Sequence, residues 1–182
     1  GGSSSGKSVF LAQRAVLDVA AGGRNYLVVR NVQKTLRLSA FNEITKAISR
    51  FKLSRFFNIN KSDLIITCVN GYQILFAGLD DVEKIKSITP AKGVITDIWV
   101  EEATETKRED VKQLSKRLRG RTPGGIKKRL TMSFNPILQD HWICADYFTQ
   151  WQDGAQRFED RNVSILKTTY KDNKFLEPDD VY

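Results

Sequence analysis

The chain has 182 residues, of which 41% are hydrophobic, and a formal net charge of +8. This length and composition suit one folded domain with its own core, and no stretch is long and apolar enough to cross a bilayer. Cys68 and Cys144 stand in no C-x-x-C pair, and the single histidine, His141, has no ligand cluster around it. A disulfide framework and a zinc site are therefore not expected.

The first predicted element is a glycine-rich loop that runs directly into a helix. Residues 1–8, GGSSSGKS, match the pattern G-x-x-x-x-G-K-[ST], which cradles phosphates with backbone N–H groups. A flexible linker has a similar composition, but Lys7 and Ser8 lead at once into an apolar repeat of helical spacing up to Ala20. That continuation favours the phosphate loop.

Further elements follow from the apolar patterns. We expect a helix at 35–51 and a hairpin turn at Asn70-Gly71 between strands 63–69 and 72–78. Other strands are expected at 25–30, 93–100, 128–134 and 161–170, and other helices at 107–118 and 140–150. Strands that alternate with helices predict an α/β fold with a mostly parallel central sheet and helices on both faces.

The loop predicts a nucleoside triphosphate site. Lys7 would place a positive charge on the phosphates, and the Ser8 hydroxyl would bind Mg²⁺. The residues expected to contact ATP are Gly1, Gly2, Ser3, Ser4, Ser5, Gly6, Lys7, Ser8 and Val9.

A pair of carboxylates, Glu101 and Glu102, follows the apolar run DIWV. Neighbouring residues of a strand point to opposite sides, so only one carboxylate should approach the metal. We assign Glu101 to Mg²⁺, through water, and Glu102 to the general base that activates the attacking water. Such a pair is also common on surfaces, and the phosphate loop upstream favours the catalytic interpretation.

Two weaker signals accompany these motifs. Ser133 and Asn135, at the end of strand 128–134, could sense the γ-phosphate, although Asn-Pro also simply begins turns. The segment 107–129 holds ten basic residues against two acidic ones and accounts for the whole excess of positive charge. It indicates either a polyanion partner or a solvated surface.

Together these segments resemble the ATPase domain of the large terminase subunit of tailed bacteriophages. The resemblance spans nearly the whole chain and rests most on FAGLDDVEKIKS at 76–87, IWVEEATE at 98–105, SFNP at 133–136 and TTYKDNKFL at 168–176. It implies a RecA-like P-loop fold of the additional-strand catalytic-glutamate type. It also implies that Glu102 is the catalytic glutamate and that Ser133 to Asn135 couple hydrolysis to movement.

The resemblance implies a domain organisation as well. We expect an ATPase domain at 1–170 and the start of a linker at 171–182. The first strand and an N-terminal segment would precede residue 1, and a nuclease domain would follow, so that the full-length protein would also be an endonuclease.

One departure from the family pattern concerns positive charge at the phosphates. Many relatives carry arginine at the loop position occupied here by Ser3. The transition-state charge must then be met elsewhere, and candidates for an arginine finger or a DNA contact are Arg117, Arg119 and Arg121.

As a terminase motor, the protein would hydrolyse ATP with Mg²⁺ to move double-stranded DNA into the procapsid. The implied partners are the portal protein, the small terminase subunit and other copies of the chain in a ring, with no membrane. The expected location is the host cytoplasm, transiently at the procapsid portal, and not the mature virion. Two alternatives stay open: another RecA-like helicase or translocase, and a nucleotide-binding assembly module without turnover.

Overall fold

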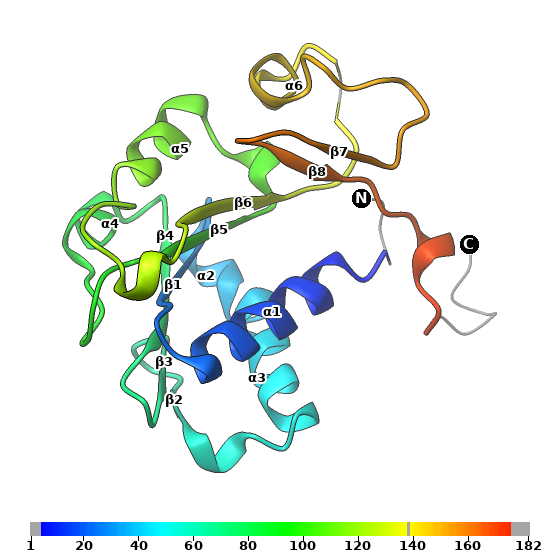
Figure 1. The fold of residues 1–182 in the computed structure, drawn as a ribbon. Coiled ribbons are helices and arrows are strands. Elements are labelled where there is room, and N and C mark those ends of the chain that lie inside the picture. Colours follow the sequence, from blue (N-terminus) through cyan, green and yellow to red (C-terminus); the bar gives the residue numbers. More distant parts are fainter. Residues whose placement is uncertain (1–4, 138, 176–182) are drawn as a thin grey trace. The chain divides into compact units, whose positions relative to one another are not determined.

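The fold is known from a computed structural model that describes residues 5–137 and 139–175 (Figure 1). The chain divides into two compact units. The larger unit is residues 8–133, and the smaller one combines residues 1–7 with residues 134–182. The predicted Gly1, Gly2, Ser3 and Ser4 contacts and residues 176–182 lie outside the described residues.

A six-stranded sheet forms the centre of the larger unit, with the strand order β2-β3-β4-β1-β5-β6. The four strands β4, β1, β5 and β6 run parallel, whereas β3 is antiparallel to both β2 and β4. The strand bounds are β1 Tyr26–Arg30, β2 Phe57–Asn60, β3 Ile65–Cys68, β4 Gln73–Gly78, β5 Asp97–Glu101 and β6 Arg129–Ser133. The expected mostly parallel α/β sheet is confirmed.

Helices cover both faces of this sheet (Figure 1). On one face, α1, α2 and α3 share a buried core with side chains of the central strands, including Val28, Phe76 and Trp99. On the other face lie α4 and α5, which bury Ile85, Val111 and Leu114. The helix bounds are α1 Lys7–Ala21, α2 Gln33–Leu36, α3 Ala40–Arg50, α4 Val82–Ser87 and α5 Arg108–Ser115.

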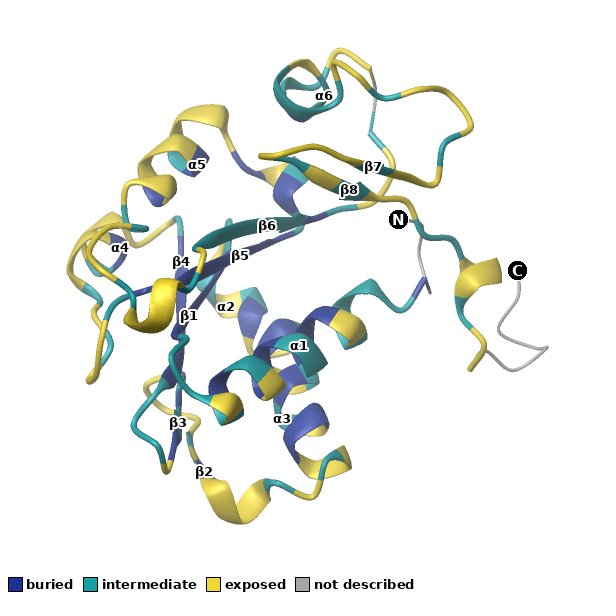
Figure 2. Ribbon diagram, in the orientation of Figure 1, coloured by how far each residue is buried: buried dark blue, intermediate teal, exposed yellow. Residues whose placement is uncertain are grey.

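The hairpin between β3 and β4 forms at the predicted turn. The Gly71 N–H donates to the carbonyl of Cys68 at 2.9 Å, and Gly71 adopts a φ of 91°, which glycine tolerates without a steric penalty. Strands β4 and β5 are buried at every residue, and β1 is buried except at Arg30, its last residue (Figure 2). The hairpin thus adds antiparallel strands to one edge of a buried parallel core.

Two sequence expectations were wrong. The predicted helix at 35–51 is two helices, α2 and α3, because Ser39 leaves the helical conformation with φ −116° and ψ −105°. The segment 161–170, expected as the last strand of the α/β sheet, contributes only β8 Ser164–Leu166, which pairs with β7 Arg157–Glu159 in a separate two-stranded sheet. Its alternation of exposed and half-buried residues suits a solvated hairpin and not a buried strand.

The smaller unit is otherwise short of regular structure in its described part. It contains α6 Trp142–Tyr147 and a single-turn helix at Tyr170–Asp172, which spans the predicted domain boundary at residue 170. That boundary stays a prediction. Both cysteines are free thiols, as expected. Within residues 5–137 and 139–175, every helix is too short or too polar to cross a membrane.

Candidate active site

The central strands place three side chains in a row at their carboxyl ends. Glu101 of β5 is the register partner of Ser133 of β6, and Arg30 of β1 follows the register pair Val29 and Val100, so that it stands next to Glu101. Since side chains alternate along a strand, all three lie on the sheet face that carries Trp99 and is covered by α1 and α3. The carboxyl edge is where ligands bind in open α/β sheets.

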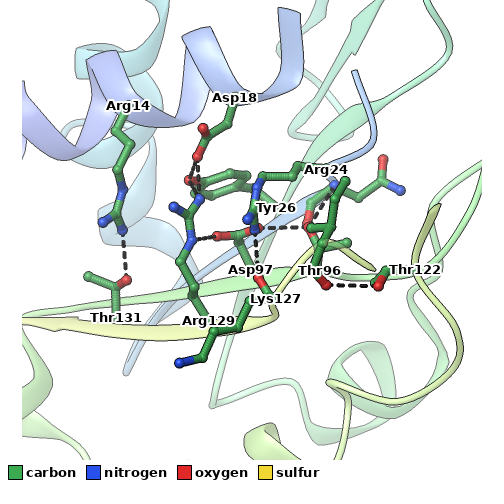
Figure 3. A network of polar contacts seen from close by, with 12 residues as sticks. Arg14, Asp18, Arg24, Tyr26, Thr96, Asp97, Thr122, Lys127, Arg129 and Thr131 are labelled. Carbon is green, nitrogen blue, oxygen red and sulfur yellow. Dashed lines mark hydrogen bonds and ion pairs between the residues drawn. The ribbon is translucent and has the colours of Figure 1, made fainter. Parts of the chain in front are cut away.

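Helix α1 runs antiparallel to these strands, as its side-chain contacts show (Figure 3). Near its end, Asp18 accepts hydrogen bonds from Tyr26 and Arg129, which begin β1 and β6. One turn earlier, Arg14 donates to the Thr131 hydroxyl at 2.7 Å. Ser8 is six residues before Arg14, about 9 Å along the helix axis. The start of α1 therefore reaches the carboxyl edge, where Glu101 lies.

The opposite edge of the sheet is fixed by a buried ionic network (Figure 3). Asp97, which is 1% exposed, binds Arg24 at 2.8 Å and also accepts from Arg129. Burial, with the nearby Asp97 carboxylate and the hydrogen bond to Asp18, raises the pKa of Tyr26. The two arginines offset the cost of burying the Asp97 carboxylate because both are in hydrogen-bonding contact with it. The network joins α1, β1, β5 and β6.

Glu101 is 4% exposed and is held by the start of α3. The Ser39 hydroxyl lies 2.6 Å from Glu101 Oε2, and the backbone N–H of Ala40 also donates to this carboxylate. Burial raises the pKa of Glu101, while the Ser39 hydrogen bond and the charge of Arg30 oppose this increase. With one oxygen fixed by Ser39, the carboxylate has a defined orientation at the edge of the sheet.

Glu102 lies just after the end of β5 in a left-handed conformation, with φ 49° and ψ 52°. The alternation rule used to place the two glutamates on opposite sides of a strand therefore does not apply to Glu102. Its carboxylate makes no hydrogen bond or ion pair with another residue of the described parts. Lys52 and Leu64 also have a positive φ, so the conformation is not special to Glu102, but strained backbone of this kind clusters at functional sites.

The two predicted coupling residues make different contacts. The Ser133 hydroxyl accepts a hydrogen bond at 2.9 Å from the indole N–H of Trp99, so it is anchored inside the larger unit. In the smaller unit, Lys7 Nζ donates to Asn135 Oδ1 at 2.8 Å. The structure thus brings a predicted phosphate-loop residue and a predicted coupling residue into direct contact.

The described part of the phosphate loop has the expected local features. Gly6 adopts a φ of 74°, and α1 begins at the next residue. Ser5 is buried, and its hydroxyl has no hydrogen-bond partner among the described residues. Ser8 and Val9 form the first turn of α1, and the Ser8 hydroxyl makes no hydrogen bond within the described residues. These are the conditions that a phosphate-binding turn requires.

The three candidate arginines after α5 differ in their surroundings. The Arg117 guanidinium donates to the backbone carbonyls of Lys86 and Ile88, so its contacts are internal. Arg119 and Arg121 are exposed. Lys128 and Arg129 also have internal contacts, with carbonyls after α5 and with Asp97 respectively. Only part of the basic segment is therefore available to an external partner.

The donor set suits Mg²⁺ only together with phosphates. In the described ranges no group of three or more His, Cys, Asp or Glu side chains could hold a metal ion by itself. Mg²⁺ is normally bound by one or two carboxylates or hydroxyls plus the oxygens of a nucleotide. Ser8 and Glu101 fit that pattern.

Sequence reasoning missed three residues of this region: Arg30, Ser39 and Trp99. Ser39 had a readable signal, since serine is favoured directly before a helix, but the predicted helix ran through it. Trp99 and Arg30 looked like core and strand-end residues, and only the strand register shows that they neighbour Ser133 and Glu101.

The fold is that of a RecA-like α/β domain, and the predicted phosphate loop leads directly into α1. The large terminase of a thermophilic bacteriophage has the same fold, with a TM-score of 0.73 and 17% identity over 98% of this chain and 41% of that one. That thermophilic phage terminase has also been solved in complex with ATP-γ-S.

Sequence comparisons specify the family. The model of the phage terminase large subunit family matches residues 1–182, and the chain belongs to this family. It is 31% identical over 180 residues to the large terminase subunit of Bacillus phage SPP1, covering 97% of this chain and 41% of that protein. The PBSX phage terminase large subunit of Bacillus subtilis is 30% identical, with 97% and 42% covered. The chain thus spans about two fifths of these relatives.

Proposed function

We propose that this chain is the ATP-hydrolysing motor part of a terminase large subunit, which drives double-stranded viral DNA into the procapsid. The observation that supports this most is the direction of α1. Its Arg14 and Asp18 contacts bring Ser8 to the carboxyl edge of the sheet, where Glu101 and Ser133 stand in register. Family membership and the ATP-γ-S complex of the thermophilic phage terminase support ATP as the nucleotide.

Each predicted residue has a defined task in this proposal. The phosphate loop and Lys7 hold the β- and γ-phosphates, and Ser8 and Glu101 would hold Mg²⁺, which neutralises phosphate charge when bound. Glu102 accepts a proton from the water that attacks the γ-phosphorus, so that ADP and inorganic phosphate result. Asn135 contacts Lys7 and would respond when the γ-phosphate leaves.

The proposal extends to the whole protein. Its partners would be double-stranded DNA, the portal protein, the small terminase subunit and further copies of the chain in a ring. The remaining part of the whole protein would be the endonuclease. The protein would act in the host cytoplasm at the procapsid portal and would be absent from the mature virion.

The test uses the whole protein with portal-bearing procapsids. Lys7→Ala should abolish ATP binding, and Glu102→Gln should keep binding but lower hydrolysis by about 10²- to 10⁴-fold, since it removes only the general base. Glu109→Gln, a matched change at an exposed glutamate of α5, should have the wild-type rate. Wild-type hydrolysis in Glu102→Gln would refute the assignment, and hydrolysis without DNA packaging would refute the motor.

A further inference from the structure

Arg30 differs from the other arginines whose Nε atoms are buried without a hydrogen-bond partner. Those others, Arg14 and Arg117, use their remaining N–H groups on Thr131 and on backbone carbonyls. None of the described residues accepts a hydrogen bond from the Arg30 guanidinium, and its Nε is buried. A buried N–H donor that is left unpaired is costly.

The only ion pair of Arg30 within the described residues is weak. Its Nε lies 3.6 Å from Glu105 Oε2, beyond hydrogen-bonding distance, and the Glu105 side chain is 49% exposed. Exposed pairs of this kind contribute little. The Arg30 side chain is itself only 20% exposed, so solvent does not replace the missing partners in full. The charge of Arg30 also acts on the neighbouring Glu101 carboxylate, but no described residue accepts a hydrogen bond from the guanidinium. The arrangement leaves N–H donors of Arg30 for a bound anionic group.

The position of Arg30 specifies which anion. It ends β1 beside Glu101 and lies on the α1 face of the sheet, at the edge that the start of α1 reaches. A planar guanidinium matches phosphoryl oxygens with two parallel N–H bonds. The predicted phosphate loop, residues 1–8, contains Lys7 as its one basic residue, so a second positive charge at the γ-phosphate has to come from outside the loop.

We propose that Arg30 binds the γ-phosphate of ATP and supplies, from within the same chain, the positive charge that stabilises its transfer. This inference rests on the proposed function. Arg30 forms no covalent bond and takes no proton; it matches the negative charge that accumulates on the equatorial γ-oxygens. Because ADP lacks this group, Arg30 should matter for the triphosphate and not for the diphosphate.

The test compares the binding of ATP-γ-S and ADP, with Mg²⁺, to the whole protein. Arg30→Gln should weaken ATP-γ-S about ten- to hundredfold, the loss expected for a charge-assisted hydrogen bond, and leave ADP within about twofold. The affinity of Arg30→Lys for ATP-γ-S should lie between those of the wild type and Arg30→Gln, because lysine keeps the positive charge but loses the two parallel N–H donors of the guanidinium. Arg50→Gln, which removes an exposed charge at the end of α3, is the matched control and should not change either affinity.

Two results would overturn the proposal. One is equal weakening, or no weakening, of both nucleotides in Arg30→Gln or, if that variant does not fold, in Arg30→Lys. The other is the same loss of ATP-γ-S binding in Glu105→Gln, which would make Arg30 a structural partner of Glu105. A different result would refute the proposed function, namely wild-type ATP binding in Lys7→Ala together with wild-type hydrolysis in Glu102→Gln. If those two variants lose function and Arg30→Gln does not, only the Arg30 assignment is wrong.

Discussion

Glu102 combines the general-base assignment with an unfavourable backbone conformation. A left-handed residue other than glycine costs about 1–2 kcal/mol, and this cost is retained here directly after a buried strand. Because of this conformation the chain leaves the direction of β5 at Glu102. The Glu102 carboxylate therefore does not have to point to the opposite face of the sheet from Glu101, as it would in a continuous strand. Stability is therefore reduced where the proposed chemistry takes place.

Glu102→Gly should raise the free energy of unfolding by about 1 kcal/mol, because glycine adopts a positive φ without strain. Denaturant unfolding without nucleotide measures the change. The same replacement at Glu109, in the first turn of α5, should lower stability, since glycine is a poor helix former. Destabilisation by Glu102→Gly would show that other contacts of this glutamate outweigh its backbone strain.

Tyr26 gives the ionic network a pH dependence. Burial raises the pKa of Tyr26, so the folded protein keeps the phenol proton at a pH where the unfolded chain has lost it. The unfolded state then binds fewer protons, and stability must fall as pH rises above the ordinary tyrosine pKa of about 10. Below that pH the contribution of Tyr26 to the free energy of unfolding is fully present.

Tyr26→Phe should not show the fall in stability above about pH 10 that Tyr26 causes in the wild type. At neutral pH the variant should be less stable by about 1–3 kcal/mol, because the hydrogen bond to Asp18 is lost. Above pH 10 the gap to wild type should narrow by about 1.4 kcal/mol per pH unit. Chemical unfolding between pH 8 and 11 checks this; a gap that stays constant contradicts a protonated Tyr26 in the folded state.

At the level of elements, the helix α5 and the connection that follows it determine how much of the positive charge is available to the proposed DNA partner. Arg117, Lys128 and Arg129 have internal partners. The other cations of the segment are exposed: Lys107, Arg108, Lys112, Lys116, Arg119, Arg121 and Lys127. The proposed DNA contacts therefore fall among these seven, whereas composition alone counted all ten cations of the segment equally.

Lys112→Ala with Lys116→Ala should weaken binding of double-stranded DNA regardless of its sequence. If both contact phosphates, the slope of log K against log salt concentration should become shallower by about 1.8, since each contact contributes about 0.9. Titrations at several salt concentrations measure the slope. The control pair Lys34→Ala with Lys61→Ala, exposed lysines of α2 and of the turn after β2, should keep the wild-type slope. If the two double variants have the same slope of log K against log salt concentration, Lys112 and Lys116 of α5 do not contact DNA phosphates.

Helices and strands were predicted correctly where the sequence pattern favours the same structure as the surrounding fold. The apolar runs of β1, β4 and β5 predicted buried parallel strands, and Asn70-Gly71 predicted the hairpin. The break between α2 and α3 was missed because Ser39 fits a helical repeat as well as a cap. Its hydroxyl contacts the Thr35 carbonyl, four residues earlier, and also Glu101, 62 positions away, and no local pattern contains the second contact.

On the scale of the whole molecule, sequence reasoning found the fold class and most of the proposed catalytic residues, because both follow from motifs. It could not find the row of Arg30, Glu101 and Ser133, since strand order and register are properties of the folded sheet. It also placed 161–170 in the main sheet, because a short apolar run does not specify its pairing partner. The boundaries between the two units fall at Lys7–Ser8 and at Ser133–Phe134. The first lies within the predicted phosphate loop and the second within the predicted coupling segment.

The ionic network at the amino ends of β1, β5 and β6 has a mechanical consequence. Asp97 and its two arginines fasten the strands at one margin, whereas hydroxyl and indole groups join them at the other. We therefore expect the carboxyl end of β6, at Ser133, to be displaced more easily than its amino end, where Arg129 is paired with Asp97 and Asp18.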